Sequence, residues 1–339
     1  MDQYYAGIDL HSTNSVIGII DNENRQIFKK KIRNDLQRIL HAFEPYREQL
    51  QGAVVESTYN WYCLVDGLME SGYRIHLANP SKIKQYEGLK YKDDVTDALH
   101  LANLLRLGIL PEGYIYPKQE RPVRDLLRKR LRLVQQKTSN ILSFQNLVQN
   151  SCCQRLSANK IRKLTDQDVV DLLGQEHRVL SGQASIRTMH FLADMIAQIE
   201  KVVRKAAKLR AEFKKLKTVP GIWDILALTI MLETGPIDRF AKVGNYASYC
   251  RCVNSKWLSN GKKKGQGNER NGNRYLSWAY VEAANHALWN YDYVKRYYQK
   301  KMAKTNHVVA IKTIAHKLAR ACYYIIRDQV EFDPQKVFV

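Results

Sequence analysis

The sequence predicts an α/β domain over residues 1–114, a long helical region over residues 115–217 and a mostly α-helical domain over residues 218–339. The first region alternates short apolar strands with helical segments, as α/β domains do. The second contains two long stretches that are rich in Lys, Arg and Leu and lack Gly and Pro. The third consists of helical segments that Gly and Pro separate.

Short apolar runs at the N-terminus predict a meander of three antiparallel strands. The runs cover residues 5–10, 15–20 and 26–29, and a turn at residues 21–24 joins the last two. Gly108 and Pro111 act as helix stop signals that close this domain. The elements expected in between are a helix at 36–50, a strand at 53–56, a helix at 61–71, a strand at 74–77, a short helix from Asn79 and a helix at 93–107.

Two long helices are expected in the second region, at residues 123–150 and 185–217. Two interpretations of this pair remain open. It forms a coiled-coil arm or dimer zipper, or it packs as an ordinary helical hairpin within one chain. The apolar residues that resemble an imperfect coiled-coil seam are Leu126, Leu127, Leu131, Val134, Ile141 and Leu142.

A polar loop is expected to interrupt the third region at residues 255–273, which contain four glycines and three consecutive lysines. Loops held by a rigid scaffold are frequent sites of catalysis, so this loop is a candidate site. The helices expected around it are at 225–232, 274–287 and 309–327.

The charge balance points to a polyanionic partner. The chain has 54 Lys and Arg residues against 33 Asp and Glu residues, a formal net charge of +21, and nucleic acid is the leading candidate for such a protein. No apolar run approaches the roughly 20 residues of a spanning helix, and no signal peptide is evident. We therefore expect a cytoplasmic protein with no membrane partner. Six cysteines without a repeated C-x-x-C pair do not predict a zinc site.

Four carboxylates of the first region, Asp9, Glu56, Asp94 and Asp97, are here called the acidic cluster. Asp9 lies within an apolar strand and Glu56 ends another, where a core strand carries a carboxylate only for a reason. Asp94 and Asp97 start a helix and share one face of it. Carboxylate oxygens suit Mg²⁺, which assists phosphoryl transfer. Alternatively, Asp94 or Asp97 only caps the helix and Glu56 is a solvated loop residue.

Ser259 is a candidate nucleophile in the polar loop. It is followed by Asn260 and Gly261 and then by three lysines. Glycine allows a phosphate to approach the backbone, and lysines stabilise a developing negative charge. The alternative is that Ser259 and Asn260 only make a turn, while the lysines bind phosphate passively.

Three blocks of the first region resemble the Asp-Glu-Asp-Asp motif of the DEDD transposases of bacterial insertion sequences. They are residues 7–12 (Gly-Ile-Asp-Leu-His-Ser), 55–58 (Val-Glu-Ser-Thr) and 92–98 (Lys-Asp-Asp-Val-Thr-Asp-Ala). The resemblance implies that residues 1–114 form a RuvC-like domain with an RNase H-like fold. It also implies that the acidic cluster is catalytic and that its four carboxylates bind Mg²⁺.

Four blocks of the third region resemble the C-terminal domain of the same family. In that family a serine before a glycine attacks DNA and forms a covalent phosphoserine, and Ser259 matches that serine best. Relatives commonly carry Gly-Leu-x-Pro upstream, where this chain has Arg-Cys-Val-Asn at residues 251–254, so Ser255 remains the second candidate. The four blocks are residues 220–222 (Pro-Gly-Ile), 235–240 (Gly-Pro-Ile-Asp-Arg-Phe), 259–262 (Ser-Asn-Gly-Lys) and 271–276 (Asn-Gly-Asn-Arg-Tyr-Leu).

The resemblance also implies partners and a place of action. Relatives assemble as dimers or tetramers through a coiled coil in the helical region, and a structured non-coding RNA guides them to donor and target DNA at the bacterial nucleoid. The expected function is therefore a transposase or recombinase that uses the acidic cluster and Ser259. A hydrolytic RuvC-like nuclease or resolvase and a non-catalytic RNA-binding scaffold are the alternatives. The side chains expected to contact nucleic acid are Lys262, Lys263, Lys264, Arg274, Arg128 and Arg132.

Overall fold

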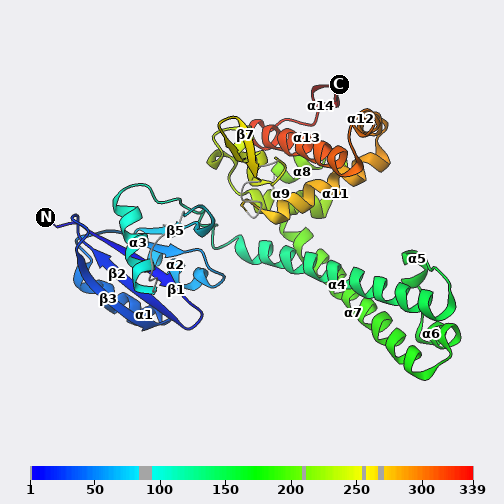
Figure 1. The fold of residues 1–339 in the computed structure, drawn as a ribbon, viewed down its shortest axis with the longest axis horizontal. Coiled ribbons are helices and arrows are strands. Elements are labelled where there is room, and N and C mark those ends of the chain that lie inside the picture. The colour runs from blue at the N-terminus through cyan, green and yellow to red at the C-terminus, as the bar shows by residue number, and fades with distance from the viewer. Residues whose placement is uncertain (1, 84–93, 208–210, 254–256, 266–270, 339) are drawn as a thin grey trace. The chain divides into compact units, whose positions relative to one another are not determined.

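The computed structural model describes residues 2–83, 94–207, 211–253, 257–265 and 271–338. The chain divides into two compact units, Met1–Lys118 (unit 1) and Gln119–Val339 (unit 2). Unit 1 contains a mixed sheet, and unit 2 is helical apart from one small hairpin (Figure 1). The domain boundaries expected at residues 114 and 217 remain predictions. Within the described ranges, no helix is both long enough and apolar enough to cross a membrane.

Unit 1 is built on a five-stranded sheet. The strands lie in the order β3-β2-β1-β4-β5. β2 pairs antiparallel with β1 and with β3, which confirms the predicted meander, whereas β4 pairs parallel with β1 and with β5. The α/β character predicted for the N-terminal domain is therefore confirmed. The strands are β1 (Tyr4–Leu10), β2 (Asn14–Ile20), β3 (Gln26–Arg33), β4 (Leu50–Glu56) and β5 (Ile75–Ala78).

The helix predicted at residues 36–50 is too long. It ends at Phe43, because Pro45 has no amide hydrogen with which to continue the i to i−4 hydrogen bonds of the helix. A short 3-10 turn follows, and Leu50 already belongs to β4. The helices of unit 1 are α1 (Leu36–Phe43), η1 (Glu44–Tyr46), α2 (Trp61–Glu70), η2 (Pro80–Lys82) and α3 (Asp94–Arg106).

Helices cover both faces of the sheet, so unit 1 has three layers. Alternate residues of a strand point to opposite faces. On one face, Ile8 of β1 shares a buried apolar core with Phe43 of α1 and Leu68 of α2. The other face carries Gly7 and Gly18, and α3 packs on it across β1, β2 and β4.

Gly7 allows α3 to lie directly on the backbone of β1. A Cβ at residue 7 would lie 1.9 Å from the carbonyl oxygen of Ala98 and 2.9 Å from the amide nitrogen of Ala102. On β2, a Cβ at Gly18 would lie 2.7 Å from the side chain of Leu99. Because α3 contributes backbone atoms at the first of these contacts, it cannot yield there as a flexible side chain would. Gly7 therefore sets the depth of α3 on the sheet.

Two long helices of unit 2, α4 (Arg121–Cys152) and α7 (Glu176–Ala207), pack along each other. Figure 1 shows them as an antiparallel pair, with α5 (Ala158–Ile161) and α6 (Asp166–Leu173) at its far end. The two helices bury an apolar seam against each other within one chain, and a coiled coil between chains remains a prediction. The buried residues of α7 recur every three or four positions, at Ile186, Met189, Leu192, Ile196, Ile199 and Val203.

The helix predicted at residues 185–217 is wrong at its start, because α7 already begins at Glu176 and contains Gly182. A Cβ at residue 182 would lie 2.8 Å from the side chains of Leu173 and Val169. This glycine therefore provides space for α6 to pack against α7 and does not end a helix.

The remaining elements of unit 2 form a helical bundle, which confirms the mostly helical character predicted for the C-terminal region. α13 lies at its centre and packs against α10, α11 and α12. Gly221 repeats the contact seen at Gly7, since a Cβ there would lie 2.1 Å from the carbonyl oxygen of Ala283 on α11. The elements are α8 (Ala211–Leu216), α9 (Asp224–Thr234), η3 (Ile237–Arg239), α10 (Val243–Tyr249), β6 (Trp257–Ser259), β7 (Lys262–Gly265), α11 (Arg274–Asn290), α12 (Asp292–Met302), α13 (His307–Asp328) and α14 (Pro334–Phe338).

We expect Gly7→Ala to destabilise the packing of α3 on the sheet by about 2–3 kcal/mol, because overpacking of this kind costs roughly 1–3 kcal/mol and the clash is with backbone. Hydrogen–deuterium exchange of peptides from β1 and α3 would measure the loss of protection. Gly244→Ala is the control, because nothing lies within 4 Å of a Cβ at residue 244. Unchanged protection in Gly7→Ala would contradict the proposed packing constraint.

Candidate active site

Asp9 and Glu56 occupy matching positions at the carboxyl ends of two parallel strands. Ile8 of β1 is in register with Val55 of β4, so the residues that follow them, Asp9 and Glu56, lie side by side at the same edge of the sheet. Asp9 is buried, at 6% exposure, and Glu56 is half-buried. A buried carboxylate is costly without compensating contacts, so Asp9 is not an ordinary core residue.

The first turn of α3 lies at the same end and on the same face of the sheet. Asp9 is two positions after Gly7 and therefore points to the face that α3 covers. α3 runs back along the strands, since Ala98 lies over Gly7 while Leu105 lies beside Gly52, near the start of β4. The structure thus brings the first turn of α3 to the ends of β1 and β4.

This first turn contains the two remaining members of the acidic cluster. Asp97 is half-buried there, one helical turn before Leu101, which packs with Val54 of β4. Asp94 is the first residue of α3. The side chain of Asp94 lies outside what the structure describes, so its direction stays a prediction.

Polar contacts hold the backbone around Asp9. The Nε2 atom of His11 lies 3.1 Å from Oδ2 of Asp9. The carbonyl oxygen of His11 accepts hydrogen bonds from the side-chain amides of Asn34 and Asn60, both at 2.8 Å. The Ser15 hydroxyl donates in turn to the side-chain oxygen of Asn34, at 2.7 Å. These amides come from two different loops and fix the chain just after β1.

The donor chemistry of the acidic cluster fits a divalent cation, because hard cations such as Mg²⁺ prefer carboxylate oxygens. Among the described side chains, no three of the His, Cys, Asp and Glu type come together as a metal-binding group. The predicted ligand set includes Asp94, whose side chain lies outside what the structure describes. The assignment of Asp9, Glu56, Asp94 and Asp97 as metal ligands therefore remains a prediction.

Part of the segment predicted as a polar loop is a β-hairpin, here called the serine hairpin (residues 257–265). β6 and β7 pair antiparallel, with Ser259 opposite Lys262. Asn260 and Gly261 form the turn and both have positive φ, 50° and 72°. Positive φ at both central residues is typical of a type I′ turn, for which Asn-Gly is the preferred sequence. The segment is predicted as a loop, and the Asn-Gly pair is the signal that could have predicted the hairpin.

Ser259 therefore lies directly before the turn, at the end of β6. The direction of its hydroxyl lies outside what the structure describes, and its role as nucleophile remains a prediction. Ser255, the second candidate, lies outside the described residues.

The segment that carries the serine hairpin is closed at its base. The Arg251 guanidinium donates two hydrogen bonds to the carbonyl oxygen of Gly272, at 3.1 and 2.9 Å. The amide of Asn273 donates to the carbonyl oxygen of Tyr249, at 2.6 Å. Gly272, with φ 92°, has no room for a side chain, since a Cβ would lie 2.6 Å from that same oxygen. The two ends of the segment are thus joined to each other.

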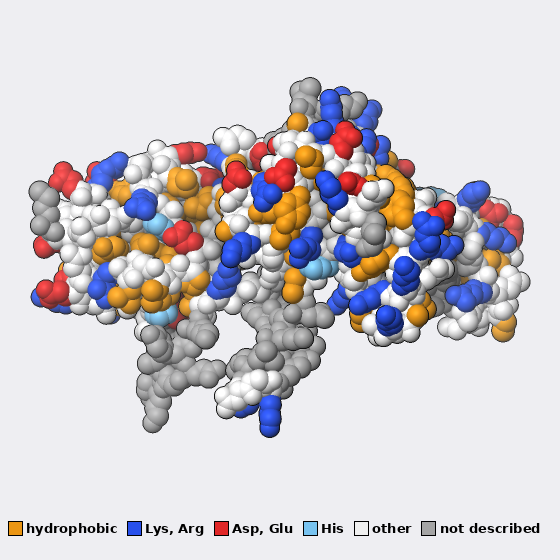
Figure 2. Space-filling view, turned by 90° about the horizontal axis from the view of Figure 1, so that it is seen from above, with side chains coloured by type: hydrophobic (Ala, Val, Ile, Leu, Met, Phe, Trp, Pro, Cys, Tyr) orange, Lys and Arg blue, Asp and Glu red, His pale blue; other side chains and the backbone are white. Residues whose placement is uncertain are grey.

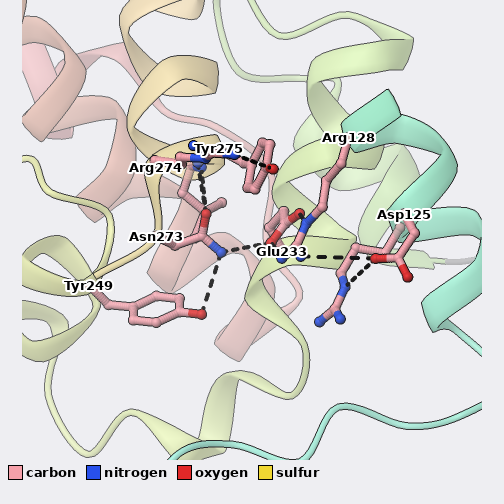
Figure 3. Close-up of polar contacts among 9 residues, drawn as sticks. Asp125, Arg128, Glu233, Tyr249, Asn273, Arg274 and Tyr275 are labelled. Carbon is pink, nitrogen blue, oxygen red and sulfur yellow. Dashed lines mark hydrogen bonds and ion pairs between the residues drawn. The ribbon is translucent and has the colours of Figure 1, made fainter. Parts of the chain in front are cut away.

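A partly buried ion pair connects this base to α4. Arg128 of α4 donates to both carboxylate oxygens of Glu233, at 2.6 and 2.8 Å (Figure 3). Glu233 is 3% exposed and also accepts a hydrogen bond from Asn273, at 2.7 Å. The other end of the Asn273 side chain accepts from the amides of Tyr275 and Leu276 and so caps α11. Sequence reasoning missed this group, because its members come from three distant segments.

The cations predicted to contact nucleic acid differ in their surroundings. The charge of Arg128 is balanced by Glu233 and its guanidinium lies over the ring of Tyr275, whereas Arg132 is exposed on α4. On the face drawn in Figure 2, Lys and Arg side chains are spread over the surface rather than gathered in one patch. Contacts of all these cations with nucleic acid stay predictions. In the third region, Lys262, Lys264 and Arg274 are exposed, and the side chain of Lys263 is not described.

We expect Arg128→Ala to destabilise unit 2 by about 3 kcal/mol, because it leaves the buried carboxylate of Glu233 without its cation. Urea unfolding followed by exchange of α9 and α11 peptides would measure this loss. Arg187→Ala is the matched control, since Arg187 pairs with Asp166 at 2.8 Å but both side chains are largely exposed, and such pairs contribute less than about 1 kcal/mol. Equal effects of the two substitutions would show that the Arg128–Glu233 pair has no special structural role.

Comparison with known families identifies both parts of the chain. A DEDD transposase model of the IS110 type matches residues 6–152, and a model described as transposase IS116/IS110/IS902 family matches residues 213–299. No curated protein matches the chain. Proteins of these families act in transposition and recombination as enzymes that cut and rejoin DNA, which makes DNA a partner, and the DEDD match points to the use of a divalent metal ion. Together the matches span more than half of the chain, which belongs to the IS110-type DEDD transposases.

Proposed function

We propose that unit 1 has an RNase H-like fold whose acidic cluster acts with Ser259 to cut and rejoin DNA strands through a phosphoserine. The strand order β3-β2-β1-β4-β5, with an antiparallel meander beside two parallel strands, supports the fold. The observation that carries the catalytic proposal is the position of Asp9, Glu56 and the first turn of α3 at one end and on one face of this sheet.

The acidic cluster would bind Mg²⁺. A bound divalent cation supplies positive charge that stabilises the attacking and leaving oxygens of a phosphoryl transfer. In this chain, the β1–β4 pairing holds Asp9 and Glu56 side by side, and the packing of α3 on Gly7 holds Asp97 above the same edge. These contacts fix the backbone that carries Asp9, Glu56 and Asp97 before a substrate arrives, so only side-chain adjustment is needed on binding.

In the proposed reaction, Ser259 Oγ attacks the phosphorus of one phosphodiester. A serine–phosphate bond forms, one ester bond of the DNA strand breaks, the hydroxyl proton of Ser259 is lost, and the released oxygen takes up a proton. The reverse step, with a hydroxyl of another strand as attacking group, joins the strands and restores the serine. The number of phosphodiester bonds is conserved, so the rejoining step needs no external energy source.

We further propose a structured guide RNA and a second copy of the chain as partners. The net charge of +21 supports the binding of more than one polyanion. The outer side of α7 exposes Leu180, Phe191 and Val202, which are eleven residues apart and therefore share one face of the helix. Large apolar side chains exposed on one face of α7 are consistent with the proposed dimer or tetramer joined through α4 and α7.

The serine hairpin also favours a second candidate function. The Asn-Gly turn has a structural reason of its own, so Ser259 need not react, and a hydrolytic RuvC-like nuclease would require the acidic cluster alone. The two functions differ in whether a covalent protein–DNA adduct forms.

We expect Ser259→Ala to abolish that adduct and strand rejoining, with a loss of several orders of magnitude, because the nucleophile is removed. Asp97→Asn should slow the same reaction by at least about a hundredfold, and removal of divalent cations with EDTA should stop it. The chain would be purified with its bound nucleic acid, which is sequenced, and then incubated with matching DNA and Mg²⁺. Denaturing gels would detect the protein-linked strand.

Ser255→Ala is the matched control and should retain the adduct. Cutting by Ser259→Ala at the wild-type rate without an adduct would identify a hydrolytic nuclease instead. If Ser259→Ala and Asp97→Asn both keep the full biological activity of the wild type in cells, the chain would be an RNA-binding scaffold.

A further inference from the structure

Tyr59 is an aromatic side chain that unit 1 places almost entirely in solvent. It is 84% exposed, although it belongs to the short connection Ser57–Asn60 between β4 and α2, whose other residues are half-buried. An exposed ring makes no apolar contact with the core. In a flexible loop, such exposure of a single aromatic residue would be ordinary. The contacts of its neighbours show that this connection is tightly held.

Both sides of Tyr59 are fixed by hydrogen bonds. Before it, the amide of Ser57 donates to the carbonyl oxygen of Ala78 on β5, at 3.1 Å, and the amide of Thr58 donates to that of Glu56, at 2.8 Å. After it, the Asn60 side chain accepts from the Thr58 hydroxyl, at 2.9 Å. The Tyr59 ring therefore extends from a backbone whose conformation is set on both sides.

The same contacts place the backbone of Tyr59 near the strand ends that carry Asp9 and Glu56. Glu56 lies three residues earlier in the chain, and Asn60 donates its other hydrogen bond to the carbonyl oxygen of His11, at 2.8 Å. His11 in turn contacts Asp9. The connection that carries Tyr59 is thus bonded to both strand ends that present carboxylates.

We propose that Tyr59 is a stacking platform for an unpaired base of the DNA strand next to the scissile phosphate. Aromatic rings bind single-stranded nucleic acid by stacking on the faces of bases, without preference for a particular base. Because the backbone that carries the ring is already fixed, binding a base restricts only the side-chain rotation of Tyr59 and orders no loop. The inference rests on the proposed function, because it takes the phosphate at the acidic cluster as the reacting one. Tyr59 acts here as a substrate-positioning residue.

Photocrosslinking tests the contact itself. The full chain would be irradiated with a single-stranded oligonucleotide that contains 5-iododeoxyuridine, which couples to aromatic side chains stacked on it, and the linked peptides would be identified by mass spectrometry. We expect a crosslink at residue 59 in the wild type and in Tyr59→Phe, and its loss in Tyr59→Ala. Crosslinks confined to other residues would overturn the proposal.

Strand cleavage tests the consequence. With the DNA that matches the co-purified nucleic acid, Tyr59→Ala should lower kcat/KM on the order of tenfold, mainly through KM, while Tyr59→Phe stays close to the wild type. Ile109→Ala is the control, because Ile109 is also largely exposed but follows the opposite end of α3. The 84% exposure of Tyr59 makes loss of folding an unsuitable explanation for its effect.

The outcomes separate this inference from the proposed function. Cleavage by Tyr59→Ala at the wild-type rate, or an equal loss in Tyr59→Phe and Tyr59→Ala, would overturn the stacking role while the acidic cluster and Ser259 keep theirs. If the wild type cuts no DNA at all, the proposed function fails, and the crosslink at residue 59 still decides whether the ring stacks on a base.

Discussion

The close contact between β1 and α3 is the constraint on which the candidate site of unit 1 depends. The backbone of α3 lies against Gly7, where even one methyl group would come within 1.9 Å of a carbonyl oxygen. This contact sets the depth at which α3 packs on the sheet, and its first turn lies near the ends of β1 and β4, where Asp9 and Glu56 are found. The carboxylates are therefore positioned by backbone packing, which changes less than side-chain conformation does.

Unit 2 combines a similar glycine contact with a polar connection. Gly221 sets the approach of the chain to α11, and the ion pair between Arg128 and Glu233 ties α4 to the base of the serine hairpin through Asn273. Removal of either partner of such a pair is costly, because it leaves a polar or charged group of the bundle without its counter-ion. The Glu233 carboxylate thus links α4, α9 and the start of α11. A displacement of α4 would therefore be transmitted through Asn273 to the segment that carries Ser259.

Local patterns predicted the elements of the fold better than their ends and contacts. The meander and the long helices follow from strand alternation and helical periodicity. The end of α1 required the effect of Pro45, and the start of α7 required knowing that Gly182 faces α6. For the site, the apolar strands around them singled out Asp9 and Glu56, but their adjacency depends on the parallel pairing of β1 with β4, which no local pattern encodes. The partners of Arg128 are equally non-local.

The closed base of the serine-bearing segment has a consequence for how this part of the chain diverges. Because Arg251 and Asn273 join the two ends, the helices on either side keep their positions whatever lies between them. We expect insertions, deletions and exchanged sequences there to cost the bundle little, because each doubling of the length of such a loop costs only about 0.6 kcal/mol. The scaffold would therefore tolerate different tips, whereas the proposed chemistry requires each tip to keep a serine in the position of Ser259.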